Sequence, residues 1–395
     1  MNRIVIIGSG ASGIVSAIFS KKDDNEVIVL EKNNDSLKKL LITGNGKCNY
    51  FNDDFSINNY SSNNIDMLKK IITNDNKNKV LNFIDSIGIK SRVKNGYYYP
   101  ASNQAFSIHN ALIKESNILG VIIKNNYEVK SIKKIDNIFI INDEIKCNKL
   151  VISTGSMAYP KTGSTGDGYR YAEYFNIKVN SVYPALVALK SDNKLLKELD
   201  GVRVECKVTN SKNNVSEMGE LQFTKEALSG ICIYNLSIDN NIDNIVVNLL
   251  NSFNINSIDE FLREMDKQNR LVKNRTITEL LEGYLNYKIV NAVLKYSKID
   301  YSKNYNVLTK REKEILGNNL VNLTFKIIDR KDYNSSQVCG GGISLEEINI
   351  NTFESKKVKD LYFTGELLDV CGKCGGYNLG FAFLSGMIVG ENIND

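Results

Sequence analysis

The sequence predicts an α/β fold: a Rossmann-type dinucleotide-binding domain that begins at the N-terminus and is interrupted by an inserted module. Three observations lead to this prediction. A glycine-rich motif at residues 8–13 follows an apolar run, and a second apolar run ends at Glu31. Apolar residues switch to helical spacing between about 257 and 320. A glycine-rich pattern returns after residue 338, so we expect the C-terminal segment to complete the first domain.

The first 31 residues are expected to form a strand, a helix and a second strand. Gly8 permits a tight turn, Gly10 lets a pyrophosphate approach the backbone, and Gly13 lets the helix pack on the sheet. The phosphates then lie at the N-terminus of the helix. Glu31 follows Gly13 at a distance where it can accept hydrogen bonds from both ribose hydroxyls, and its charge repels a 2′-phosphate. The pattern therefore favours FAD or NAD over NADP.

The middle of the chain is expected to contain further strands. Polar, Asn-rich residues 52–79 predict a surface excursion with short helices. Strict alternation of apolar and polar residues at 202–208 predicts a half-buried strand of a different, antiparallel module. Four apolar runs predict strands before that module: residues 121–123, 127–132, 138–141 and 150–152.

The later part of the chain is expected to be helical and then to return to the sheet. Ser257, Thr276 and Thr309 each precede a glutamate by three residues, which is typical of a helix start. A strand at 361–363 and an apolar helix within 375–390 follow. The expected domains are therefore a discontinuous FAD-binding Rossmann-type domain (1–185 and 338–395), a β-rich substrate domain (186–250 and 321–337) and a helical insertion (251–320).

Composition restricts the possible functions less than the motifs do. A length of 395 residues suggests two or three domains, and the formal charge of +5 is spread without a basic block. The seven cysteines are an odd number scattered along the chain, which favours a reducing, cytoplasmic location. Long apolar runs are missing, so no membrane span is expected. With His109 as the single histidine, we expect no metal site.

Several longer motifs occur in one order along the chain. They stand at residues 41–49, 159–168, 183–186, 223–224, 229–230, 340–342, 363–369 and 375–378. Together they resemble the bacterial BaiN-like (YhiN-like) NAD(P)/FAD-dependent oxidoreductases, some members of which are named aminoacetone oxidases. The resemblance spans essentially the whole chain.

The resemblance implies FAD, bound by a Rossmann core of the two-dinucleotide-binding-domain flavoprotein type with an inserted β-barrel-like and helical module. By position, the implied pyrophosphate, ribose and adenosine contacts are Gly8, Gly10, Ala11, Ser12, Gly13, Glu31, Lys32, Val129, Thr154 and Gly155. The implied contacts along the ribityl chain and flavin are Gly44, Gly46, Lys47, Cys48, Asn49, Gly365, Glu366, Asp369, Gly376, Tyr377, Asn378 and Leu379.

The chain departs from the family pattern at some positions. Lys47 stands where the family usually has arginine, so the charge remains but a bidentate contact is lost. Lys225 replaces the usual histidine of a Phe-Thr-His motif, which leaves the substrate open. Cys371 and Cys374 form a C-x-x-C pair that is either a dithiol, with thiolate favoured by an adjacent lysine, or ordinary loop packing. The catalytic candidates are Lys47, Tyr159, Cys371 and Cys374, and no role is assigned among them.

These observations predict an FAD-dependent oxidoreductase that passes a hydride between flavin N5 and either a small organic substrate or NAD(P)H. The substrate is an amine or aminoketone to be oxidised, or an enone-type double bond to be reduced by NAD(P)H. The alternatives are a flavin-dependent tRNA-modifying enzyme and a non-catalytic FAD-binding protein. The nearly balanced charge argues against a nucleic-acid partner. The oligomeric state is left open.

Overall fold

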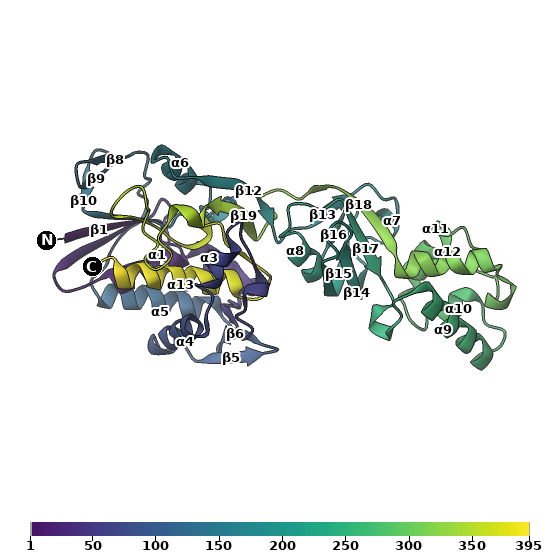
Figure 1. Cartoon of the computed structure of the whole chain (residues 1–395). Helices are drawn as coiled ribbons and strands as arrows, with labels where there is room; N and C mark the ends of the chain where they lie inside the picture. Colours follow the sequence, from purple (N-terminus) through teal and green to yellow (C-terminus); the bar gives the residue numbers. More distant parts are fainter. Residues whose placement is uncertain (1, 395) are drawn as a thin grey trace. The chain divides into compact units, whose positions relative to one another are not determined.

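The structure is a computed structural model that describes residues 2–394. It divides into two compact units (Figure 1). The first unit comprises the chain up to Ala185 and from Tyr333 onward, and the second comprises Leu186–Asp332. Each unit has its own cluster of buried apolar residues.

A five-stranded parallel sheet forms the centre of the first unit. Its strand order is β20 (Leu361–Phe363), β11 (Lys149–Ile152), β1 (Asn2–Ile7), β2 (Asn25–Leu30) and β7 (Ile122–Lys124). The strands are almost continuously apolar because a parallel sheet is covered on both faces. Leu150 pairs with Leu361, so the C-terminal segment adds a strand to the sheet that the N-terminus begins.

Two helices pack closely through glycines beside this sheet. These are α1 (Ala11–Ser20) and α13 (Tyr377–Asn392), which lie next to each other in Figure 1. A Cβ atom on Gly386 would lie 2.5 Å from the carbonyl oxygen of Ser12, and one on Gly390 would lie 2.3 Å from Phe19 Cβ. The glycines of α13 therefore bring the C-terminal helix against the helix that follows the glycine-rich loop.

Smaller elements complete the first unit. A meander is formed by β8 (Ile132–Ile135), β9 (Ile138–Ile141) and β10 (Ile145–Cys147). Another sheet contains β3 (Phe51–Asn52), β6 (Tyr97–Pro100) and β5 (Ser91–Lys94), and β4 (Tyr60–Ser61) pairs with β21 (Cys371–Gly372). The antiparallel pair β12 (Val179–Ala185) and β19 (Val338–Ile343) lies where the chain leaves and re-enters the unit. The helices are α2 (Lys38–Ile42), α3 (Ile65–Lys69), α4 (Asn74–Ser86), α5 (Ala105–Ile118) and α6 (Asp167–Tyr174).

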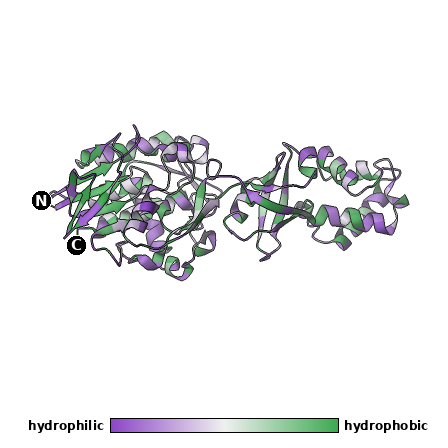
Figure 2. Ribbon diagram, turned by 90° about the horizontal axis from the view of Figure 1, so that it is seen from above, coloured by the Kyte–Doolittle hydropathy of each residue, from purple (hydrophilic) through white to green (hydrophobic). Residues whose placement is uncertain are grey.

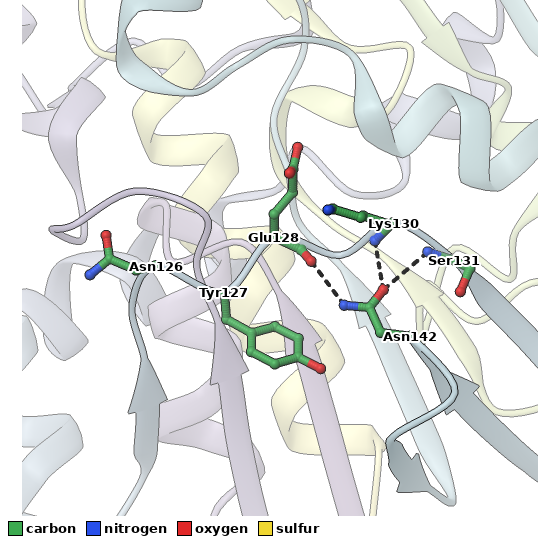
Figure 3. A pocket seen from close by; sticks show the side chains of 6 residues that line it. All are labelled: Asn126, Tyr127, Glu128, Lys130, Ser131 and Asn142. Carbon is green, nitrogen blue, oxygen red and sulfur yellow. Dashed lines mark hydrogen bonds between the residues drawn. The ribbon is translucent and has the colours of Figure 1, made fainter.

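One expected strand is wrong. Residues 127–131 are irregular, and strand β8 begins only at Ile132. The Asn142 side chain accepts hydrogen bonds from the N–H groups of Lys130 (2.7 Å) and Ser131 (3.2 Å), as Figure 3 shows. The Asn142 side chain therefore accepts the hydrogen bonds that the carbonyl groups of a neighbouring strand would otherwise accept.

The second unit contains a closed six-stranded barrel. Its strands are β13 (Leu189–Ser191), β16 (Ala227–Ser229), β15 (Ser216–Phe223), β14 (Arg203–Asn210), β17 (Asn244–Asn248) and β18 (Leu323–Arg330). Its helices are α7 (Leu195–Glu198), α8 (Ile231–Leu236), α9 (Ile258–Leu271), α10 (Ile277–Leu281), α11 (Tyr287–Tyr296) and α12 (Lys310–Val321). Barrel and helices share one apolar core, to which Phe223, Phe261 and Phe325 contribute. The expected Rossmann-type fold with a barrel-like and helical insertion is confirmed.

The three expected helix starts are also confirmed. Thr276 and Thr309 begin α10 and α12 with reciprocal capping boxes. Ser257 accepts a hydrogen bond from Glu260 N at the start of α9, whereas the Glu260 carboxylate accepts from Asn256 N. The helices of this unit carry both hydrophilic and hydrophobic residues (Figure 2). Among residues 2–394, no helix is long and apolar enough to cross a membrane.

Candidate cofactor-binding site

The three glycines of the first loop differ in what surrounds them. A Cβ on Gly8, which has φ +99°, would lie 2.6 Å from the Ser153 carbonyl oxygen, and one on Gly13 would lie 2.0 Å from the Gly8 carbonyl oxygen. Protein packing therefore requires both. The Cβ position of Gly10 has nothing within 4 Å. A side chain at this position would fill the space over Gly10. No side chain caps the N-terminus of α1 there, so this open space suits a pyrophosphate.

The Glu31 carboxylate is held firmly at the end of β2. It is 7% exposed. One oxygen accepts from Ser9 N (2.9 Å) and Oγ (2.7 Å), and the other from Asn33 N (2.8 Å) and Nδ2 (2.7 Å). Four donors occupy the lone pairs of the two oxygens. A ribose would therefore reach Glu31 when the Ser9 hydroxyl or the Asn33 amide turns aside.

Lys32, expected beside the adenosine, forms an ion pair with Asp167 at the start of α6 (2.7 Å). Partial burial opposes ionisation of Asp167, but hydrogen bonds from Lys32 and Thr165 and the charges of Lys32 and Arg170 outweigh it and lower the pKa of this carboxyl. Lys32 is therefore tied to α6.

Val129, the expected adenine contact, is buried in the irregular segment before β8. Its carbonyl oxygen accepts a hydrogen bond from the Tyr171 hydroxyl (2.6 Å). A polar pocket of about 520 Å³ flanks this segment (Figure 3). It is lined by Asn126, Tyr127, Glu128, Lys130, Ser131 and Asn142. Asn142 uses both ends of its amide here, since Nδ2 also donates to the Glu128 carbonyl oxygen (2.9 Å).

Thr154 and Gly155 follow β11 after one residue, Ser153, so they lie at the carboxyl edge of the parallel sheet. A Cβ on Gly168 would lie 2.3 Å from Thr154 Oγ1, which brings the start of α6 against this loop. Gly155 has φ +71°, a conformation that favours glycine.

The loop expected along the flavin has left-handed residues at Gly44, Gly46 and Cys48. Lys47 is exposed, and Cys48 is fully buried. Burial raises the pKa of the Cys48 thiol to about 12, although a hydrogen bond with Thr43 acts in the opposite direction. Cys48 is therefore a neutral thiol at physiological pH.

The chain just after the loop at residues 44–49 contacts the turn before α13. A Cβ on Gly376 would lie 2.6 Å from Phe51 N, two residues beyond the partly buried Asn49. The Asn378 side chain accepts from Gly372 N (2.8 Å) and donates to Gly372 O (2.7 Å), so it holds β21 against the first turn of α13. The Tyr377 ring packs edge-on against Tyr60, with centroids 5.6 Å apart. The N-terminus of α13 is thereby fixed in place.

Glu366 forms a cluster that the sequence did not reveal. Lys39 Nζ lies 2.7 Å from one carboxylate oxygen, while Ser156 Oγ (2.8 Å) and Cys339 N (3.1 Å) donate to the other. Lys39 and Ser156 were not among the expected site residues. Lys39 stands in α2 next to Lys38, and no local pattern distinguishes the two.

Asp369 and two nearby hydroxyls complete this part of the site. Asp369 Oδ2 accepts from Asn63 N, Asn63 Nδ2 and Asn180 Nδ2 at 2.8–3.0 Å. Within residues 2–394, the buried hydroxyls of Tyr169 and Thr364 have no hydrogen-bond partner. Burial is the main cause that raises the pKa of Tyr169, and the charges of Cys339, Glu366 and Asp369 add to it. Buried hydroxyls normally have partners, and the hydroxyls of a ribityl chain could supply them. The residues present therefore fit FAD.

Cys371, Cys374 and Tyr159 lie in different environments. Cys371 is buried in β21, whereas Cys374 is half-buried, and no disulfide joins them. Burial raises the pKa of Cys371 well above its usual value, and the neighbouring Glu366 raises it further. We expected the adjacent Lys373 to favour the thiolate form of this pair. At Cys371 the opposite holds, because burial favours the neutral thiol. Tyr159 has φ +55°, unusual for a residue with a side chain, and donates its N–H to Tyr333 O (2.8 Å).

Comparison with known proteins identifies the family. The HI0933-like protein Rossmann domain matches residues 2–392. The chain belongs to this family. It is therefore a flavoprotein of the oxidoreductase class with a Rossmann-type FAD-binding domain.

Two relatives match this chain over nearly their whole length. A 3-dehydro-bile acid delta(4,6)-reductase from Clostridium scindens is 31% identical, over 99% of this chain and 98% of the relative. A ribosomal RNA dihydrouridine synthase from Escherichia coli is 27% identical, over 98% of this chain and 97% of the relative. A solved 3-ketosteroid-delta4-(5alpha)-dehydrogenase from Rhodococcus jostii shares the fold, with a TM-score of 0.52, 11% identity, and coverage of 100% of this chain and 97% of that one.

Proposed function

We propose that this protein is an FAD-dependent reductase that adds a hydride to a carbon–carbon double bond conjugated to a carbonyl group, with NAD(P)H as the hydride donor. The observation that carries the proposal is the full-length similarity to two relatives named for such reductions. A bile-acid Δ4 bond beside a 3-oxo group and the 5,6 bond of uracil are both conjugated to a carbonyl. The substrates differ, but the reacting group is the same.

The residues of this chain suit that chemistry. When bound, FAD supplies a hydride acceptor and donor at N5. The open space over Gly10 and the N–H groups at the start of α1 would bind the pyrophosphate. Asp369 and the orphan hydroxyls of Tyr169 and Thr364 would bind the ribityl chain. The N-terminus of α13, at Tyr377, would favour negative charge on a reduced flavin and so raise its reduction potential.

The donor would have to bind without a nucleotide domain of its own. Residues 186–332 form a barrel and helices, and no second strand–glycine motif–helix unit occurs in that described segment. NAD(P)H and the unsaturated substrate would therefore reach the same flavin, one after the other.

An anaerobic titration tests the proposal. The purified protein is titrated with NADH and then with NADPH while the absorbance of oxidised flavin is followed, and an enone or uridine substrate is then added. We expect bleaching by a pyridine nucleotide and return of the band on addition of the unsaturated acceptor. A colourless protein would overturn the proposal. So would flavin that resists both nucleotides but is reduced by an amine or aminoketone with oxygen consumption on re-aeration.

A further inference from the structure

Two cysteines of the second unit take no part in the proposed function. Cys206 stands in β14, and Cys232 stands in the first turn of α8. Both are buried free thiols. We propose that this pair is a reversible oxidation site, at which hydrogen peroxide converts the two thiols to a disulfide bond between α8 and the barrel. The inference goes beyond the proposed function, because it rests on the second unit alone and needs no flavin.

The strand opposite Cys206 carries a glycine. Cys206 pairs with Gly219 of β15, and paired residues of an antiparallel sheet carry their side chains on the same face. A Cβ on Gly219 would lie 3.9 Å from the Cβ of Cys232. The side chain of Cys232 therefore lies against the side-chain position of Gly219, next to Cys206.

A second glycine brings α8 close to the strands, and α8 packs beside β15 (Figure 1). Gly230 precedes α8 with φ +104°, and a Cβ there would lie 2.2 Å from the Glu220 carbonyl oxygen. The Cys232 thiol donates a hydrogen bond to the same carbonyl oxygen (3.5 Å). The start of α8 is therefore held against β15, at the strand that pairs with Cys206.

The two thiols form a hydrogen bond with each other. Because the Cys232 thiol donates to Glu220, the Cys206 thiol is the donor to the Cys232 sulfur. This hydrogen bond lowers the pKa of Cys232, although burial acts in the opposite direction. It is also the main cause that raises the pKa of Cys206, and burial adds to that effect. Cys232 is therefore the thiol that ionises first, while Cys206 keeps its proton.

The pair lies just below the surface of the unit. Cys206 is 3% exposed and Cys232 is 0% exposed, whereas Ile231, next to Cys232 in the chain, is 56% exposed. A local opening at the start of the short helix α8 would admit a molecule as small as hydrogen peroxide. Burial keeps out the thiol of a second protein, so the bond that forms lies within this chain.

The reaction balances with peroxide as the oxidant. The Cys232 thiolate attacks one oxygen of hydrogen peroxide, the O–O bond breaks, and the released hydroxide takes up the proton that Cys232 lost. The Cys206 sulfur then attacks the sulfenic acid at Cys232, so that the S–S bond forms and the S–O bond breaks. The departing hydroxyl leaves with the Cys206 proton as a second water. The thiols lose two electrons, the peroxide gains them, and a dithiol reductant reverses the change by thiol–disulfide exchange.

The test uses the full-length protein with FAD bound, reduced with dithiothreitol, desalted and treated with a small excess of hydrogen peroxide. Remaining thiols are blocked under denaturing conditions, and tryptic peptides are analysed by mass spectrometry without reduction. We expect a linked peptide that joins Cys206 to Cys232 and that disappears when dithiothreitol is added. Because the bond closes a loop of the chain, it should also raise the melting temperature of the second unit by about 5–10 °C.

Two variants separate the roles of the thiols. Cys206→Ser leaves Cys232 without a sulfur to attack it, so the sulfenic acid at Cys232 should persist and be trapped by dimedone. Cys232→Ser leaves only the buried Cys206, which should remain unlabelled. The matched control is Cys147→Ser, which removes a buried thiol of the first unit. This control should form the linked peptide and show the same rise in melting temperature as the wild type.

Each outcome decides for or against the inference. Unlinked Cys206 and Cys232 after peroxide treatment would overturn it, and so would a bond from either cysteine to a different one. Dimedone on Cys206 in the Cys232→Ser variant, with none on Cys232 in the other variant, would contradict the assigned attack. A linked pair with an unchanged melting temperature would show that the bond does not hold α8 to the barrel. Bleaching of flavin by NAD(P)H enters none of these measurements, so failure of the proposed function would leave this inference standing.

Discussion

At the scale of single residues, the glycines of the first loop differ: packing requires Gly8 and Gly13, whereas we propose that Gly10 leaves room for the pyrophosphate. Gly10 has φ −70° and ψ −177°, which alanine adopts readily, and nothing lies within 4 Å of its Cβ position. We expect Gly10→Ala to leave the melting temperature of the apoprotein nearly unchanged but to weaken FAD binding at least about tenfold, or about 1.4 kcal/mol. Co-purified FAD and a fluorescence titration of apoprotein measure both effects.

Gly13→Ala is the control for this prediction. Its Cβ would lie 2.0 Å from the Gly8 carbonyl oxygen, so this variant should lose about 1–3 kcal/mol of stability as well as FAD. If Gly10→Ala melted as early as Gly13→Ala, or retained normal FAD affinity, the space over Gly10 would not be the pyrophosphate site.

The cysteines lead to a second prediction. Burial raises the pKa of Cys48 to about 12 and that of Cys339 to about 11, with the charge of Glu366 adding to the effect at Cys339. Only the thiolate reacts with an alkylating agent, so both should resist iodoacetamide at pH 8. Cys374 is more accessible and should be modified first.

Mass spectrometry of the alkylated native protein measures the order of labelling, and denatured protein provides the control. The buried, neutral thiol of Cys371 is a poor partner for dithiol exchange. Cys371→Ser should therefore retain bleaching by NAD(P)H. Early labelling of Cys371, or a loss of bleaching in the serine variant with FAD still bound, would indicate a redox role.

The sequence predicted site residues where one short segment carries the chemistry. The glycines at 8–13 and Glu31 could be proposed as candidates because a tight turn, a pyrophosphate and a ribose each place a requirement on residues close together in the chain. Lys39, Ser156 and Glu366 come from segments far apart in the chain. Their cluster depends on tertiary packing, so no local spacing could have revealed Lys39 or Ser156.

At the scale of elements, the helix starts were predictable because a cap is local chemistry. Thr309 and Glu312 satisfy each other's backbone groups at the start of α12. The hydrogen bond from Thr309 N and the nearby Lys303 lower the pKa of Glu312 to about 2. The strand expected at 127–132 was wrong because its apolar pattern did not show that Asn142, in a later turn, would take its N–H groups.

The capping box gives a prediction with a defined pH dependence. A folded-state pKa below the unfolded value of about 4.3 means that ionised Glu312 stabilises the fold above that pH. This stabilisation is lost as the pH falls from about 4.3 through about 2. We therefore expect Glu312→Ala to destabilise the protein at pH 7 and the difference from wild type to shrink below pH 4.

Urea unfolding at pH 7, 5 and 3.5, followed by circular dichroism, measures this difference. Glu314→Ala serves as the control, because Glu314 lies on the same helix outside the capping box. A difference that is independent of pH would show that the ionised carboxylate does not stabilise the start of α12.

At the scale of the whole molecule, the sequence predicts the broad fold better than it predicts the pairing of distant strands. The broad fold was predictable because the apolar runs are long enough to show their periodicity. Closure of the barrel, in contrast, depends on pairing of distant strands such as β13 with β18.

The topology also predicts that the inserted unit folds alone. Ala185 pairs with Val338 in the β12–β19 ribbon, and Lys331 N donates to Ala188 O (2.9 Å), so the two ends of the insertion are neighbours. The barrel and its helices share a core without residues of the first unit. We expect a fragment of residues 186–332 to unfold cooperatively and to bind no FAD, because the glycine loop, Glu31 and Asp369 all lie outside it. Circular dichroism melting and a flavin titration test this, and a fragment that binds FAD or melts without a transition contradicts it. Cooperative folding would mean that the insertion does not depend on the first unit for its stability.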